Sequence, residues 1–192
     1  ALGYSIQSFW ESIVEERHKD LISELFDMGD KNTNILSFKV LNGSRPDIGV
    51  RPLIFDVNLT ANSLIESAGN DFIINIGKTI GTQSEMYQTK ERKQPIDIQF
   101  AHHFYRRIEF SIPKGYKVSN PTDLIMNVEM VENGKVSAFF TSWYEQAGNT
   151  LYIYSREAYP EIEYPVSSFN QFRSVVNAAA DFNKKKLIIT PL

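Results

Sequence analysis

The sequence predicts a mainly β fold, antiparallel and β-sandwich-like, with an N-terminal amphipathic helix and a short C-terminal helix. Aromatic residues make up 12% of the 192 residues, including 13 Phe and 9 Tyr, and aromatic side chains favour strands. Several segments alternate apolar and polar residues with a period of two, the pattern of half-buried strands. Apolar residues at helical spacing occur near the two ends of the chain.

The first element is expected to be one helix with an apolar stripe that lies on the following sheet. Ser5 or Ser8 is a candidate cap at its start, and Gly29-Asp30 is its expected end. Residues 1–30 are therefore expected to form a linker helix, and 31–192 a β-sandwich-like domain with a candidate internal boundary at 77–94. The stripe consists of Ile6, Phe9, Trp10, Ile13, Val14, Leu21, Leu25 and Phe26.

Alternating segments predict strands through the rest of the chain, and Gly- and Pro-containing stretches predict the loops between them. A second helix is expected over 167–182, because apolar residues there lie on one side. The expected strands are 36–40, 53–60, 72–76, 96–100, 108–112, 124–131, 136–144, 150–156 and 187–190.

The dipeptide Asn133-Gly134 predicts a tight hairpin, because both turn positions require positive φ. A two-residue loop fixes the register of the flanking strands. The expected cross-strand pairs are Glu132 with Lys135, Val131 with Val136, and Val128 with Phe139.

Composition excludes several classes of function. The 20 basic and 23 acidic residues are interspersed, which argues against nucleic-acid binding. The absence of Cys removes disulfides, thiolate metal sites and cysteine nucleophiles. The apolar runs are too short to predict a membrane span, and no signal peptide is recognisable. Because the chain opens with Ala-Leu-Gly, we expect a piece of a longer protein.

Two short motifs suggest a phosphate-binding loop and a metal site, but neither has the residue arrangement that such a site requires. Gly77-Lys78-Thr79 resembles part of a phosphate loop, but Phe72 stands where that motif needs glycine and Gly81 interrupts any following helix. His102-His103 suggests a metal site, but neighbouring residues on a strand point to opposite faces. We therefore expect no metal and no cofactor.

A group of aromatic and acidic residues in the second half leaves two further hypotheses open. An aromatic face could bind a glycan or a peptide, although such residues are more often part of a core. Alternatively, His102 or His103 could act as a base beside Glu157 or Asp97. The candidate binding residues are Trp143, Tyr152, Tyr154, Tyr159, Glu161 and Tyr164, with Tyr144 as a further ring.

The second half also resembles a known family. The stretches that carry the likeness are ERKQPID at 91–97, IPKGYKV at 112–118, the strands around 133–134, and Tyr-Pro at 159–160 leading into the last helix. They resemble the C-terminal domain of unknown function that follows transglutaminase-like domains in bacterial envelope proteins. The first half is similar to the linker helix and first strands that precede this domain. One departure is that Asn120-Pro121 only approximates the family's usual proline.

The resemblance implies a fragment of a larger periplasmic or extracellular polypeptide. The Cys-His-Asp machinery of a transglutaminase-like domain would lie outside this chain, and that domain would be its partner. The tail itself has no known catalytic residue to carry over, so we expect a non-catalytic accessory domain. A carbohydrate-binding module is the alternative.

Overall fold

The computed structural model describes residues 2–26, 33–87 and 91–192. The chain divides into two compact units, Ala1–Ser63 and Leu64–Leu192. Each unit has its own hydrophobic core. The division lies between Ser63 and Leu64. The sequence instead predicted a limit at residue 30, where the first helix was expected to end, and a candidate internal boundary in the polar stretch 77–94. The division falls after Ser63 because the first two strands pair with each other and join the core formed by the first helices.

In its described residues, the first unit contains two α-helices and one antiparallel strand pair. Ile6, Trp10, Ile22 and Ile35 form its buried core, to which the inward side chains of both strands add. The elements are α1 (Leu2–Trp10), α2 (Glu15–Leu25), β1 (Asn34–Leu41) and β2 (Ile54–Thr60).

The expectation of one continuous N-terminal helix is wrong. The backbone N–H groups of Ser12 and Ile13 bond to carbonyls three residues back, and Val14 is extended. The break lets the Trp10 ring stack on His18, with ring centroids 4.3 Å apart. Phe9, Val14 and Leu25 consequently lie on the surface instead of in the stripe. The expected end at Gly29-Asp30 lies outside the described residues.

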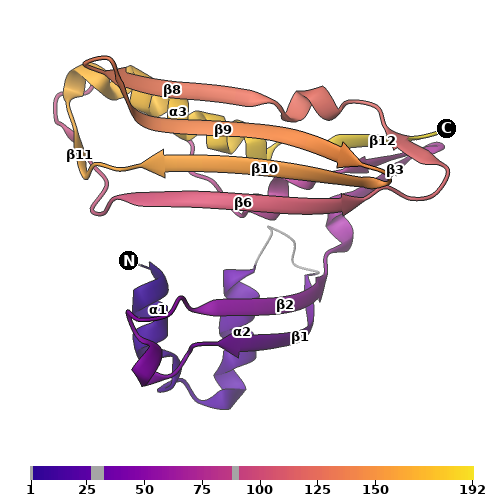
Figure 1. Cartoon of the computed structure of the whole chain (residues 1–192), viewed down its shortest axis with the longest axis horizontal. Coiled ribbons are helices and arrows are strands. Elements are labelled where there is room, and N and C mark those ends of the chain that lie inside the picture. The colour runs from indigo at the N-terminus through magenta and orange to yellow at the C-terminus, as the bar shows by residue number, and fades with distance from the viewer. Residues whose placement is uncertain (1, 27–32, 88–90) are drawn as a thin grey trace. The chain divides into compact units, whose positions relative to one another are not determined.

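The second unit is built on antiparallel sheets, which confirms the fold class. The main sheet has the strand order β6-β10-β9-β8, a second sheet has the order β3-β4-β12-β7, and β11 pairs with β5. Figure 1 shows the main sheet in front of the C-terminal helix α3 (Phe169–Asn183). The strands are β3 (Ile65–Ala68), β4 (Asp71–Ile74), β5 (Ile96–Asp97), β6 (His102–Ser111), β7 (Tyr116–Val118), β8 (Met126–Glu132), β9 (Lys135–Ala147), β10 (Thr150–Tyr159), β11 (Glu163–Tyr164) and β12 (Leu187–Pro191).

The core of the second unit lies on one side of the main sheet, which we call the inner face. Alternate residues of β10, such as Leu151 and Ile153, are fully buried there, while the residues between them are partly exposed. Helix α3 packs on this face through an apolar side that includes Phe172 and Phe182. Leu187 and Ile189 of the second sheet belong to the same core.

The hairpin at Asn133-Gly134 is confirmed, with φ of 50° and 75° at its two turn residues. The predicted pairs of Glu132 with Lys135 and of Val131 with Val136 are present. The third pair is shifted, because a bulge between Met130 and Val131 places Val128 opposite Phe140 rather than Phe139.

The other differences concern strand lengths. β6 begins at residue 102 instead of 108, and the strand expected over 96–100 ends at residue 97. β4 ends at Ile74, because Ile76–Ile80 form a 3-10 turn. The short strands β3, β7 and β11 were not predicted. β3 pairs with β4, β7 pairs with β12, and β11 pairs with β5.

Candidate functional site

The side of the main sheet that faces away from α3 carries a row of aromatic rings and charged groups. We call it the outer face. In Figure 1 it is the side of the sheet toward the viewer. The register of the four strands places the following residues on it: His103, Tyr105, Arg107 and Glu109 of β6; Tyr152, Tyr154, Arg156 and Ala158 of β10; Phe139, Thr141, Trp143 and Glu145 of β9; and Asn127 and Glu129 of β8.

Three rings of the outer face form a ladder across three strands. Tyr154 lies directly opposite Trp143, and the two rings are nearly parallel, with centroids 5.1 Å apart and 16° between their planes. Tyr105 stacks on Tyr154 from the next strand, at 6.5 Å and 25°. Stacked cross-strand pairs of this kind stabilise a sheet and hold the rings in fixed positions.

Arginines extend the ladder on both sides. The Arg107 guanidinium lies over the Tyr152 ring, 5.0 Å from its centroid, and Arg156 lies over Phe139 at 5.8 Å. Arg107 also forms an ion pair with Glu109, with 2.9 Å between Nη2 and Oε1. The outer face therefore presents rigid rings and cations together, the side-chain types that dominate binding energy at protein interfaces.

The predicted binding residues do not all meet on this face. Trp143, Tyr152 and Tyr154 lie on it, but the expected aromatic face is wrong for Tyr159 and Tyr164, which are 3% and 1% exposed. Both rings point into the core and contact Phe172 of α3.

The two remaining candidates also lie away from the outer face. Tyr144 lies on the inner face, packed against the core. Glu161 is exposed in the connection between β10 and β11, where its backbone N–H donates to the Tyr164 hydroxyl.

The histidines lie on opposite faces of β6, as strand geometry predicts. His103 is on the outer face, with its ring 6.4 Å from that of Phe139. His102 is on the inner side, where its ring lies 5.0 Å from that of Tyr159 and its Nδ1 contacts the Phe100 carbonyl. Asp97 accepts a hydrogen bond from the Gln99 backbone.

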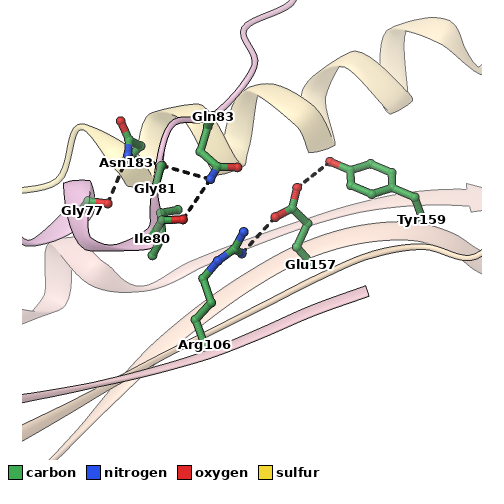
Figure 2. A network of polar contacts seen from close by, with 8 residues as sticks. All are labelled: Gly77, Ile80, Gly81, Gln83, Arg106, Glu157, Tyr159 and Asn183. Atoms are coloured by element: carbon green, nitrogen blue, oxygen red, sulfur yellow. Dashed lines mark hydrogen bonds and ion pairs between the residues drawn. The ribbon is translucent and has the colours of Figure 1, made fainter. Parts of the chain in front are cut away.

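Glu157, the other acid considered as a partner for these histidines, belongs to a polar network within the core. One of its carboxylate oxygens accepts a bond from Arg106 Nη1 at 3.0 Å, and the other accepts one from the Tyr159 hydroxyl at 3.1 Å (Figure 2). The Glu157 side chain is 6% exposed and that of Arg106 is 18% exposed. Both carboxylate oxygens thus have structural partners, and the network pairs a charge that would be costly to bury alone.

This network changes the acidity of Tyr159. Burial, followed by the negative charge of Glu157 and the bond to it, raises the pKa of the Tyr159 hydroxyl well above its usual value. Burial also raises the pKa of Tyr164. Both shifts have structural causes, since neither ring is exposed.

The segment that resembles a phosphate loop is a packing element. Figure 2 shows Asn183, at the end of α3, donating from Nδ2 to the carbonyls of Gly77 and Gly81, at 3.3 and 2.8 Å. A Cβ atom at Gly77 would lie 2.1 Å from the Phe182 carbonyl oxygen. Glycine is therefore required at position 77 for close approach to α3, which accounts for it without a ligand.

Within the described ranges, no group of three or more His, Asp or Glu side chains is arranged to hold a metal ion. None of the helices that the structure describes is long and apolar enough to cross a membrane.

The outer face includes residues that the sequence prediction missed, notably Tyr105, Arg107 and Arg156. The signal that could have found them is the alternation of side chains along each strand, in which odd-numbered and even-numbered residues point to opposite faces. Once the hairpin fixes which residues of β9 share a side with Trp143, the same alternation carries across to Tyr154 and, in a strand that begins at residue 102, to Tyr105 and Arg107.

Comparison with known proteins identifies the family of the second unit but no individual relative. No curated protein and no solved structure matches the chain. Residues 71–189, within the second unit, match the family described as a Domain of Unknown Function (DUF3858). This match spans more than half of the sequence, and the chain belongs to the DUF3858 family.

Proposed function

We propose that the chain is a non-catalytic accessory domain of a larger secreted or periplasmic protein, and that its outer face binds a transglutaminase-like domain of the same polypeptide. The observation that carries this proposal is the ladder of Trp143, Tyr154 and Tyr105 with its flanking arginines. The identity of the neighbour and the location outside the cytoplasm rest on the resemblance of the second half to tails of such proteins.

The composition of the outer face favours a protein partner. Tyr, Trp and Arg are enriched at the energetic centres of protein interfaces. Tyr and Trp bury a large area and lose little conformational freedom, and Arg supplies a charged group with several hydrogen-bond donors. Here the rings are already ordered by stacking, so little additional ordering is required on binding.

The test is a titration of the 192-residue chain with a separately purified transglutaminase-like domain, followed by calorimetry. We expect saturable binding that Trp143→Ala weakens by about tenfold or more. Tyr87→Ala is the matched control, since Tyr87 is an exposed ring, 66% accessible, outside the outer face. Equal affinity for both variants would contradict the role of the outer face, and turnover of amide or peptide substrates by the chain alone would contradict the non-catalytic assignment.

A carbohydrate-binding module is the second candidate, favoured by three aromatic residues, Trp143, Tyr152 and Tyr154, on one face. The geometry supports it less well, because Trp143 and Tyr154 turn their ring planes toward each other. Sugar stacking instead requires a free ring face. Titration with soluble oligosaccharides, monitored through Trp143 fluorescence in a Trp10→Phe variant, tests it; no saturable change at millimolar concentrations would exclude it.

A further inference from the structure

Strand β6 forms one edge of the main sheet, and in the part of the chain that the structure describes it pairs only with β10. Ile112, the residue directly after β6, shows which backbone groups face β10, because its N–H donates to the Asn149 carbonyl at 2.7 Å. Antiparallel ladders alternate, and the register from residue 102 to 111 has no shift. The even-numbered residues therefore bond to β10.

The odd-numbered residues direct their N–H and C=O groups to the free side of β6. They are His103, Tyr105, Arg107, Glu109 and Ser111, all of which are exposed. A ten-residue edge strand with unpaired backbone groups is a template for a further strand.

The charges on this edge are self-complementary. Arg107 and Glu109 lie two residues apart on the same face of the strand. If a second copy of β6 pairs antiparallel about a twofold axis at Ile108, each Arg107 lies opposite Glu109 of the other copy. Axes at Arg106 or Arg107 would instead place two arginines opposite each other, which is unfavourable.

The register centred on Ile108 also satisfies the backbone. It brings the outward groups of Arg107 and Tyr105 opposite those of Glu109 and Ser111 in the other copy, so donors meet acceptors along the edge. The Arg107–Glu109 ion pair within each of the two copies is exchanged for two equivalent pairs between the copies, so the number of ion pairs is kept.

We propose that this chain forms a symmetric dimer through antiparallel pairing of β6 with β6 of a second copy, centred on Ile108. The two main sheets then form one continuous eight-stranded sheet with a closed twofold interface. The two outer faces lie side by side on this sheet. Arg107 belongs to both the outer face and the dimer interface, whereas the stacked pair of Trp143 and Tyr154 lies on the central strands β9 and β10 and stays available.

Sedimentation equilibrium of the full 192-residue chain at low salt tests the dimer. We expect a reversible monomer–dimer equilibrium that Arg107→Glu weakens by about tenfold or more, because it places carboxylates opposite one another. The double variant Arg107→Glu/Glu109→Arg restores complementary charges and is expected to restore dimerisation. Arg156→Glu is the matched control, since Arg156 is exposed on the same face but lies in the central strand β10.

A backbone variant tests the edge independently of charge. Glu109→Pro removes an N–H that faces away from β10, so the ladder within the chain is kept and only the edge is blocked. Circular dichroism and the midpoint of thermal unfolding check that each variant is folded. A folded chain that stays monomeric up to about millimolar concentration, where even a weak dimer would form, would overturn the proposal. So would a dimer that Arg107→Glu and Glu109→Pro leave unchanged.

Discussion

Tyr159 is a buried phenol, and its ionisation should limit stability at alkaline pH. Its pKa is raised by burial and by Glu157, so the folded state keeps the neutral hydroxyl where the unfolded chain, with a pKa of about 10, loses its proton. The stability that this difference contributes is fully present below about pH 10 and is lost as the pH rises toward the folded-state pKa.

We therefore expect the free energy of unfolding to fall above pH 10 more steeply in the wild type than in Tyr159→Phe. The difference in slope is expected to approach about 1.4 kcal/mol per pH unit, the value for one proton. Urea titrations from pH 8 to 11.5 measure it, and slopes are compared because Tyr159→Phe also loses the bond to Glu157. Tyr105→Phe, which removes an exposed phenol, controls for the loss of one tyrosine. Identical slopes in wild type and Tyr159→Phe would contradict the burial of this hydroxyl.

The same residue shows why the site could be predicted only in part. Trp143, Tyr154 and Tyr159 all lie in two adjacent strands, and composition gives no reason to separate them. What separates them is parity: Tyr154 and Tyr159 are an odd number of positions apart on β10 and so point to opposite faces. Which face is covered depends on where α3 packs, and that packing involves residues far away in sequence.

The contact between the 3-10 turn at Ile76–Ile80 and the end of α3 depends on one glycine. Gly77→Ala should destabilise the chain by about 2–3 kcal/mol, because its Cβ would meet the backbone carbonyl of Phe182 and force the two segments apart. Gly115→Ala is the control: Gly115 has a φ of 84° but open space around it, so the expected loss of about 1 kcal/mol comes from backbone strain alone. Urea unfolding of both variants measures the difference, and a smaller effect at Gly77 than at Gly115 would refute the packing role.

Elements with a strong local signal were predicted well, and elements that depend on distant partners were not. The hairpin at Asn133-Gly134 follows from two residues that favour positive φ, and the structure has it in the expected register near the turn. β7 has only three residues, and it exists because it pairs with β12 about seventy positions later. The break between the two N-terminal helices could not be predicted from the apolar stripe. The apolar residues keep helical spacing across residues 11–14, although the backbone there is not helical.

The two units have separate cores, so we expect the whole chain to unfold in two separate transitions. In the residues that the structure describes, the first unit has two α-helices, one two-stranded sheet and a small buried core, whereas the second has two four-stranded sheets and a larger core. Small units bury a smaller fraction of their surface, and two strands alone are marginally stable. The first unit should therefore unfold at a lower urea concentration than the second.

The chain contains two tryptophans, and each unit has one of them, Trp10 in the first and Trp143 in the second. In the Trp143→Phe variant, Trp10 fluorescence reports the unfolding of the first unit, and the substitution lies in the second unit. In the Trp10→Phe variant, Trp143 fluorescence reports the unfolding of the second unit, and the substitution lies in the first. We expect a lower urea midpoint for Trp10 fluorescence than for Trp143 fluorescence, with circular dichroism of the wild type following both transitions. Coincident midpoints in the two variants would mean that the chain unfolds as one cooperative body, because each reporter lies in an unaltered unit.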